Sequence, residues 1–305
     1  MHQALFSLKR VATPQTQFAI SVDGCFVQIK HLYQRTIKTI TFVIINISIV
    51  YLGSNIIMEK VLYAELTPQE FRERIKACPI AYLPLGTLEW HGEHLPLGSD
   101  GIQSQGFFVK LAEKVGGIVL PMLFMGPDGA TEISDGNYLY GMDNWTGEKQ
   151  AGKKIRESAQ LDGSAYWLSD ESFFNLIDCI FKQLKRAGFK IIVAHGHGPS
   201  TGFVAKYSKE WLDKYGLTVL NCWGSEYDSD GMGIQVDHAG MNETSLVWAI
   251  RPELVQMGRL SDSMEPEQIP VAVSGKDPRF HASREKGEKI IEMNLERMAK
   301  ILNIL

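Results

Sequence analysis

Apolar residues between Met58 and the C-terminus follow two alternating patterns. Short runs of mostly apolar residues have the length of buried strands, and we expect strands at residues 80–85, 118–122, 189–194 and 217–222. Between these runs, apolar residues recur at spacings of three and four, which is typical of helices that bury one face. The clearest stretch contains Phe173, Phe174, Ile177, Ile180, Phe181 and Leu184.

Residues that favour helix ends flank these stretches. The segment Thr-Pro-Gln-Glu at 67–70 is a capping box with proline at the first helical position. Ser99 or Asp100 is expected to cap a second helix, and Ser169 a third that ends at Gly188. We expect helices at about 67–77, 100–115, 169–187, 202–215 and 283–303, and a further one that begins at about Asn242.

This alternation of strands and helices predicts an α/β fold with a mostly parallel sheet and helices on both faces. We expect residues 58–305 to form one domain of this kind. Functional side chains in such folds lie at the C-terminal ends of the strands. Polar residues that directly follow the predicted strands are therefore the candidates for chemistry.

Residues 1–57 differ from the rest of the chain. A polar stretch at 30–39 precedes an uncharged run at 40–51, which is rich in β-branched residues and includes Asn46 and Ser48. This run is shorter than the ~20 residues of a membrane span. Three interpretations of the extension stay open: a poorly ordered segment, a signal or anchor sequence, or sequence upstream of a true start at Met58.

Composition and charge narrow the class of protein. With 45% hydrophobic residues, 22% charged residues and a net charge of −4, the chain lacks the basic excess of a nucleic-acid-binding protein, and we expect no membrane partner. The cysteines contain no Cys-x-x-Cys pair, which disfavours a cysteine-type zinc site and a disulfide framework. A cytoplasmic protein is expected.

Three polar clusters lie directly after predicted strands or before predicted helices. Each cluster alone has an ordinary explanation, such as surface polarity, a glycine-rich connection or a helix cap. Five of the eight histidines, with His94 of the first segment included, nevertheless lie in them beside carboxylates, which together favour a divalent-metal site. The candidate residues are Glu89, His91 and Asp100 in the first cluster, His195 and His197 in the second, and His238 and Glu243 in the third.

The segments around these clusters resemble the creatininase (creatinine amidohydrolase) family. Residues 85–96, Leu-Gly-Thr-Leu-Glu-Trp-His-Gly-Glu-His-Leu-Pro, are similar to the family's Gly-Ser/Thr-x-Glu-x-His-Gly-x-His-Leu-Pro signature, which an aspartate closes, here Asp100. The strand and turn at 191–200 and the segment His-Ala-Gly-x-x-Glu-Thr-Ser at 238–245 are similar to two further family segments. The similarity extends from about Leu62 to the C-terminus.

This resemblance implies a metal-dependent amidohydrolase that acts on a small molecule and forms a homo-oligomer. A metal-activated hydroxide would cleave a C–N bond of an amide, cyclic amide or formamide, with Zn, Mn or Fe as the ions. His238 would pass a proton to the leaving nitrogen. The implied ligands are Glu89 and His197 for one ion, His91 for the other, Asp100 as the bridge and Glu243 as a further ligand.

Three features depart from the family's pattern. His195 and Ser200 replace asparagines of the turn, and Pro199 stands where the family has a glutamate ligand. The second ion then depends on Glu243 or water, a single-metal site stays open, and creatinine itself is disfavoured as the substrate. The region 126–168 is longer than the family's equivalent, and its aromatic residues are expected either to line a substrate pocket or to pack against a neighbouring subunit. These are Tyr138, Tyr140, Trp145, Tyr166 and Trp167.

Two other functions are considered. A metallophosphoesterase of the calcineurin type also places histidines after an apolar strand, but the sequence lacks that family's Asp-x-His and Asn-His-Glu/Asp motifs. A non-catalytic metal-binding scaffold of the same fold is favoured by Pro199 and His195, and it is opposed by the presence of all six expected site residues. A serine hydrolase and a nucleotidase are not expected.

Overall fold

The computed structural model describes residues 60–127, 129–263, 265 and 268–304, together with three short strands before residue 30. The chain divides into two compact units, Met1–Met58 and Glu59–Leu305. In the first unit, an antiparallel sheet has the order β1 (Lys9–Arg10), β2 (Phe18–Val22) and β3 (Cys25–Ile29). The run at 40–51, where an anchor was one interpretation, lies outside the described residues.

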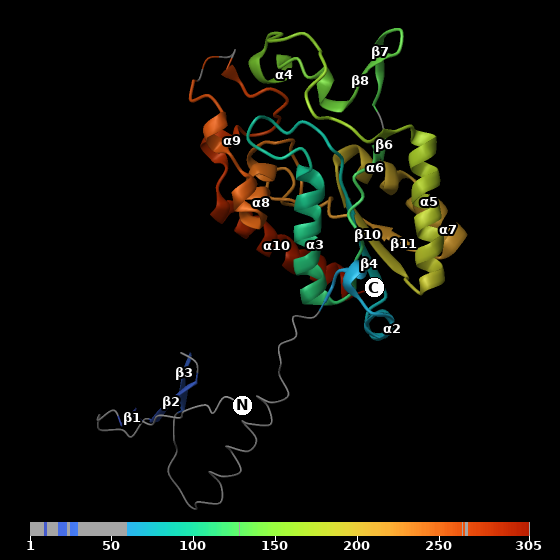
Figure 1. Cartoon of the computed structure of the whole chain (residues 1–305), viewed down its shortest axis with the longest axis vertical. Helices are drawn as coiled ribbons and strands as arrows, with labels where there is room; N and C mark the ends of the chain where they lie inside the picture. Colours follow the sequence, from blue (N-terminus) through green and yellow to red (C-terminus); the bar gives the residue numbers. More distant parts are fainter. Residues whose placement is uncertain are drawn as a thin grey trace, which may run out of the picture. The chain divides into compact units, whose positions relative to one another are not determined.

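A four-stranded parallel sheet forms the centre of the second unit (Figure 1). Its order is β11 (Thr218–Leu220), β10 (Ile191–Gly196), β4 (Ile80–Leu85) and β5 (Ile118–Val119). The two central strands pair from Ile191 opposite Ile80 to Gly196 opposite Leu85. Every residue of β4 is buried, which is why this strand is apolar throughout rather than alternating. The predicted parallel α/β fold is confirmed.

Helices cover both faces of this sheet (Figure 1). Side chains alternate along each strand, so Tyr82 and Val193 point to one core, while Leu83 and Ala194 point to the other. The first core is covered by α3 (Ser99–Val115), α8 (Met241–Ile250) and α10 (Arg284–Leu302). The second is covered by α2 (Pro68–Ala77), α5 (Asp170–Ala187), α6 (Gly198–Lys206) and α7 (Ser208–Tyr215).

The segment after β10 differs from the prediction in two ways. The strand continues to Gly196, so His195 belongs to the strand and not to the turn. The single helix expected at 202–215 is two helices that are separated at Tyr207, and the first begins four residues early because Pro199 suits a first helical turn. A Cβ atom on Gly196 would lie 1.6 Å from the Leu85 carbonyl oxygen, so only glycine fits where the strand turns into α6.

Two further boundaries were predicted incorrectly. The strand expected at 118–122 ends at Val119, because the register then shifts by one residue: Tyr82 pairs with Val119, whereas Leu85 pairs with Leu123. Helix α3 begins at Ser99 with Gly98 at its N-cap position, and neither Ser99 nor Asp100 caps it. The hydroxyl of Ser99 instead accepts a hydrogen bond from the Gln103 amide.

The region 126–168 contains several short elements rather than one long loop. A two-residue parallel pairing joins β6 and β9, and β7 and β8 form an antiparallel hairpin. The elements are β6 (Gly126–Pro127), β7 (Thr131–Ser134), β8 (Asn137–Leu139), the 3-10 helix η2 (Gly141–Asn144), α4 (Glu148–Ala151) and β9 (Trp167–Leu168).

The remaining elements are short. They are the 3-10 helices η1 (Tyr63–Glu65), η3 (Pro252–Leu254) and η4 (Met257–Arg259), and helix α9 (Pro278–His281). Among the described residues, no helix combines the length and apolar character needed to cross a membrane.

Candidate metal centre

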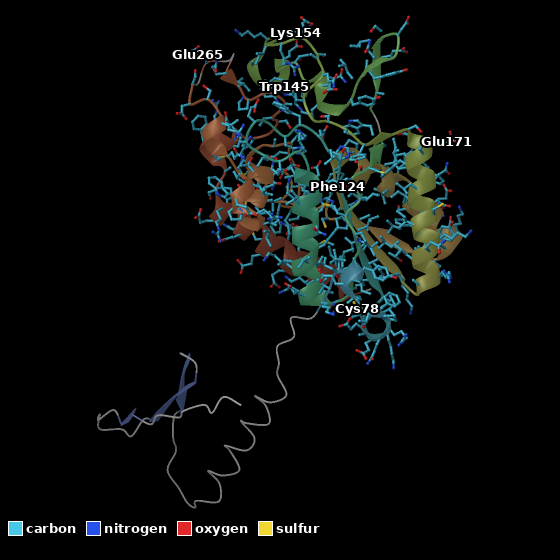
Figure 2. All side chains as sticks on the ribbon, in the orientation of Figure 1. Cys78, Phe124, Trp145, Lys154, Glu171 and Glu265 are labelled. Carbon is cyan, nitrogen blue, oxygen red and sulfur yellow. The ribbon has the colours of Figure 1, made fainter. Side chains whose placement is uncertain are left out.

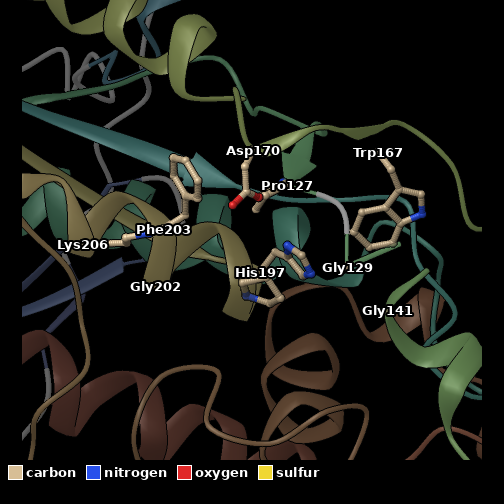
Figure 3. A pocket seen from close by; sticks show the side chains of 10 residues that line it. Pro127, Gly129, Gly141, Trp167, Asp170, His197, Gly202, Phe203 and Lys206 are labelled. Carbon is tan, nitrogen blue, oxygen red and sulfur yellow. The ribbon is translucent and has the colours of Figure 1, made fainter. Parts of the chain in front are cut away.

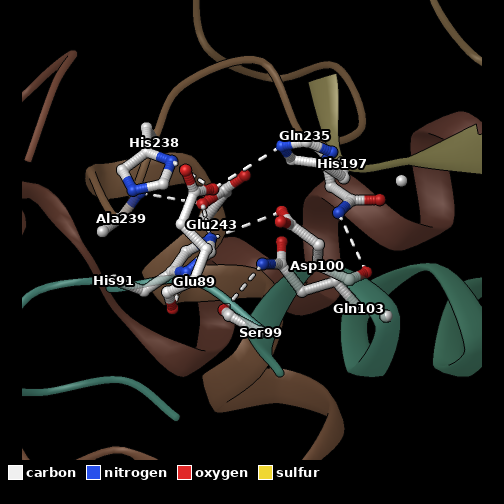
Figure 4. A network of polar contacts seen from close by, with 12 residues as sticks. Glu89, His91, Ser99, Asp100, Gln103, His197, Gln235, His238, Ala239 and Glu243 are labelled. Carbon is white, nitrogen blue, oxygen red and sulfur yellow. Dashed lines mark hydrogen bonds and ion pairs between the residues drawn. The ribbon is translucent and has the colours of Figure 1, made fainter. Parts of the chain in front are cut away.

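All six predicted site residues come together at the C-terminal edge of the sheet; His238 lies at the edge of the group and the other five form its centre (Figure 4). Glu89 and His91 follow β4, and His197 follows β10, so the pairing of these two strands brings them close. Asp100 lies in the first turn of α3 and Glu243 in the first turn of α8. All five side chains are buried.

A phenylalanine holds the loop that carries these ligands. The ring of Phe124, near the centre of the second unit (Figure 2), packs against Gly86, Gly98 and Gly101. A Cβ atom on any of these glycines would come within 3.0–3.2 Å of that ring. Because Gly101 lies next to Asp100, this close packing fixes the start of α3 beside the loop that carries Glu89 and His91.

His91 is oriented by its own loop. Its Nδ1 donates to the Glu89 carbonyl oxygen at 3.0 Å, as ligating histidines commonly do with their second nitrogen. Its Nε2 lies 3.4 Å from Asp100 Oδ1 and 3.5 Å from Glu243 Oε2, and it is buried without a hydrogen-bond partner. Two ligand atoms at about 2.1 Å from a tetrahedral ion lie about 3.4 Å apart. These three atoms therefore fit around one divalent ion.

A second group of ligand atoms lies next to the first. His197 Nε2 is 3.7 Å from Glu89 Oε2, while Glu89 Oε1 accepts a hydrogen bond from the Met142 backbone N–H at 3.3 Å. Asp100 Oδ2 is buried and has no hydrogen-bond partner. The ligand atoms of Glu89, Asp100 and His197 lie within 4.8 Å of one another, as do those of His91, Asp100 and Glu243. Asp100 is the residue that the two groups share.

Three buried carboxylates at one point attract positive charge. Burial raises the pKa of Glu89 to about 7 and raises that of Glu243 well above its ordinary value. Burial alone would lower the pKa of His91, but Asp100 first, and then Glu243 and Glu89, raise it to about 10. A proton or a divalent cation can neutralise these carboxylates, and a metal ion that binds there displaces the proton. Imidazole and carboxylate donors together suit Zn, Mn or Fe.

His238 lies at the edge of this cluster. Its Nε2 donates to the Trp90 carbonyl oxygen at 2.9 Å, and its ring lies 4.2 Å from the His91 ring. Its Nδ1 is therefore the nitrogen that can accept a proton, and it lies 4.0 Å from Glu89 Oε2. Ligand atoms of Glu89, His91 and His238 also lie within 4.8 Å of one another. The geometry thus allows His238 to act either as a proton carrier or as a ligand.

The two histidines of the second cluster have different surroundings. His195 is buried in β10, where its Nε2 donates to the Ile234 carbonyl oxygen at 3.0 Å and its ring contacts Trp223. It lies outside the two groups of ligand atoms. His197 alone reaches the centre, as the family resemblance implies.

Sequence analysis did not identify Ser200 as part of the site. Residues 198–202, Gly-Pro-Ser-Thr-Gly, have the Gly-x-Ser-x-Gly spacing that is typical of serine hydrolases, but they form the beginning of α6 itself rather than a turn between strand and helix. In addition, Ser200 is completely buried, and its Oγ is hydrogen-bonded to His197 Nδ1 at 2.9 Å. It therefore orients His197 and is not exposed as a nucleophile.

Asp237 is another residue to which the sequence assigned no role. Its carboxylate accepts hydrogen bonds from the backbone N–H groups of Asn242 at 2.8 Å and Glu243 at 3.1 Å, at the beginning of α8. Glu243 Oε2 in turn accepts from the Ala239 N–H at 2.8 Å. Asp237 thereby fixes the position of Glu243. An aspartate a few residues before a helix was the available signal.

A cleft of about 680 Å³ opens onto these residues and is lined by Glu89, Asp100, His197, His238 and Glu243 among others. Of the five aromatic residues at 126–168, Tyr140 and Trp167 are next to it. Their rings stack at 6.0 Å, and Trp167 contacts the His197 ring at 5.6 Å. Tyr138 and Tyr166 are 43% and 59% exposed. The aromatic region therefore reaches the site through Trp167, on which Tyr140 stacks.

Comparison with known proteins identifies the family of this chain. Residues 64–136 and 156–302 match the sequence model of the creatininase family, described as creatinine amidohydrolase. The chain belongs to the creatininase family. Its class of activity is accordingly hydrolysis of a C–N bond, with metal dependence as a family property. The match omits 137–155, within the region that the sequence indicated to be longer than in the family.

Individual relatives agree with this family. The creatinine amidohydrolase of Pseudomonas putida is 25% identical over 272 residues, which cover 79% of this chain and 95% of that protein. Two solved structures share the fold at 23% identity and cover 80% of this chain and 97% of their own. They are a mutant creatininase complexed with creatine, at a TM-score of 0.61, and a mutant creatininase of Zn-Zn type, at 0.60.

Proposed function

We propose that this protein cleaves a C–N bond of a small amide, cyclic amide or formamide at a centre of two divalent ions. The observation that carries the proposal is the shared position of Asp100 between the two groups of ligand atoms. Glu89 and His197 would hold one ion, His91 and Glu243 the other, and Asp100 both. Zn, Mn or Fe fits these donors, and creatininase structures have been described with Zn and with Mn.

The chain's own residues have separate parts in this reaction. When bound, the ions would lower the pKa of a water molecule and polarise the carbonyl group of the substrate. Met142 N–H and Ser200 Oγ keep Glu89 and His197 in place. His238 would take up a proton at Nδ1, because its Nε2 is committed to the Trp90 carbonyl, and release it to the leaving nitrogen.

Removal of metal gives the first test. After dialysis against a chelator, the protein is expected to lose hydrolysis of the whole substrate set, which consists of cyclic amides, formamides and short peptides. Addition of Zn²⁺ or Mn²⁺ should restore activity, whereas Mg²⁺ should not, since imidazole ligands suit it poorly. The measurements are elemental analysis and release of amine. Purified protein that contains no Zn, Mn or Fe would contradict the proposal, and bound metal without any hydrolysis would favour the non-catalytic scaffold.

We further propose that residues 58–305 are the complete catalytic domain and that 1–57 are dispensable for it. A chain that starts at Met58 is expected to melt within a few degrees of the full chain and to bind the same amount of metal. Thermal unfolding and elemental analysis provide the comparison, with the full chain as the control. If the shorter chain aggregates or loses metal, the extension is a structural part of the enzyme.

Location and assembly belong to the same proposal. Cys78, Cys179 and Cys222 are free thiols, which supports a cytoplasmic location. A homo-oligomer is proposed from the family resemblance alone, and sedimentation of the metal-loaded protein tests it.

A further inference from the structure

A second, smaller cavity opens beside the candidate metal centre. It has a volume of about 260 Å³, and Gly141, His197 and Pro199 line both this cavity and the larger cleft. Figure 3 shows Trp167, Asp170 and Phe203 around His197 in this cavity. We call it the side cavity. Because the two spaces share three lining residues, the side cavity is directly adjacent to the candidate metal centre.

Two of the three shared residues have small side chains. Gly141 has no side chain, and the Pro199 ring folds back onto its own backbone at the beginning of α6. A glutamate at position 199, as in the family pattern, would add a flexible carboxylate at the junction between cleft and cavity. The exchange that removes a ligand from the family's pattern thus also leaves room for a substrate.

The walls of the side cavity suit an apolar group. Pro127, Pro199, Trp167 and Phe203 contribute rings, whereas its two charged residues are exposed. Of these, Lys206 places its ammonium group 5.0 Å from the centre of the Tyr207 ring. The volume is slightly below the ~300 Å³ at which pockets for drug-sized ligands begin, and it is sufficient for one ring or branched chain.

We propose that the side cavity receives an apolar ring or branched chain that the substrate carries next to its scissile C–N bond. This inference rests on the proposed function and narrows the class of substrates. The substrates would be amides with such a substituent, rather than molecules as small as creatinine, which leave the side cavity unfilled.

Gly202 offers a direct way to fill the cavity. It lies on the exposed side of α6 and lines the side cavity, and a Cβ atom added to it would meet no other atom within 4 Å. The first side-chain atom of Gly202→Leu therefore meets no clash, and leucine suits a helix better than glycine. Gly202→Ala is the graded variant. Ala205→Leu is the matched control, because Ala205 is exposed on the same helix and does not line the side cavity.

The experiment compares formamide with N-benzylformamide on the metal-loaded full chain. Calorimetry measures binding of each compound, and a separate assay measures their hydrolysis to formate and ammonia or benzylamine. The wild-type protein should prefer the benzyl compound in both assays. Gly202→Leu should reduce that preference by roughly 10- to 200-fold, the range for a misfit in a hydrophobic pocket. The preference of Gly202→Ala for the benzyl compound should lie between those of wild type and Gly202→Leu. Ala205→Leu should have the same preference as wild type.

Each outcome tests either the assignment of the side cavity or the proposed hydrolysis of C–N bonds. Equal binding of both compounds by wild type, or an equal loss of both in Gly202→Leu, would overturn the assignment of the side cavity. Hydrolysis of both compounds without an effect of Gly202→Leu would overturn it too, while it leaves the amidohydrolase function intact. Benzyl-selective binding that depends on Gly202, with neither compound hydrolysed, would instead remove the proposed function and retain the cavity as a binding site.

Discussion

Asp100→Ala is expected to lose both metal ions and essentially all hydrolysis. Asp100 is the residue that both groups of ligand atoms share, so its removal leaves each ion with two protein ligands. Even partners that only support a ligand are worth roughly 10- to 100-fold in metal affinity or activity. A loss of more than about 1,000-fold in kcat/KM is therefore expected, measured by amine release together with elemental analysis.

Thermal unfolding separates this effect from misfolding. Metal at 100 times its dissociation constant stabilises a protein by about 2.7 kcal/mol, which corresponds to a rise of roughly 5–10 °C in Tm for a domain of this size. Wild type should show this rise, and Asp100→Ala should not. Glu93→Ala is the control, because Glu93 is an exposed carboxylate of the same loop. If Asp100→Ala still binds two equivalents of metal, Asp100 is not the bridge.

The sheet could be predicted from the sequence because a strand that is buried on both faces is a continuous apolar run. β4 and β10 are apolar over most of their length, since each side chain enters one of two cores. Their parallel pairing then brought Glu89 and His197 together without any knowledge of the side-chain packing. Topology of this kind can be inferred from pattern alone, whereas the exact ends of the elements cannot.

The incorrect boundaries arise where tertiary contacts prevail over local preferences. Asp100 has a residue type that favours helix caps, but its carboxylate faces His91 at 3.4 Å. Tyr207 has no property that ends a helix, and the break there accompanies a contact of its ring with Phe174 of α5. Such contacts depend on residues that are distant in sequence, so periodicity could not indicate them.

The supporting residues of the site were hidden for a similar reason. Ser200 hydrogen-bonds to His197, and the Asp237 carboxylate accepts the backbone N–H of Glu243. In the sequence, a serine or an aspartate near a helix start is an ordinary feature. The supporting role of such a serine or aspartate can be recognised only when the residue to which it is hydrogen-bonded is known to be a candidate ligand. The side cavity was also hidden, because it forms where β9, α5 and α6 meet.

His238→Ala is expected to keep both metal ions and to lose activity by about 100- to 10,000-fold, the usual contribution of a positioned proton carrier. The Nδ1 of His238 is the nitrogen that can accept a proton, since Nε2 donates to Trp90. The deficit should depend on the leaving group. A p-nitroanilide, whose nitrogen is a better leaving group and needs less protonation, should be affected less than an alkyl amide. His238→Gln, which can still donate to the Trp90 carbonyl, should show the same dependence.

The competing role of His238 gives a different result. Its ligand atom also lies within 4.8 Å of those of Glu89 and His91, so it could bind an ion directly. In that case His238→Ala would lose one equivalent of metal, and its rates on the anilide and the alkyl amide would fall together. His281→Ala, which changes an exposed histidine, controls for a general effect of the substitution. Metal content and leaving-group dependence therefore decide between proton transfer and ligation, because each role affects a different one of the two measurements.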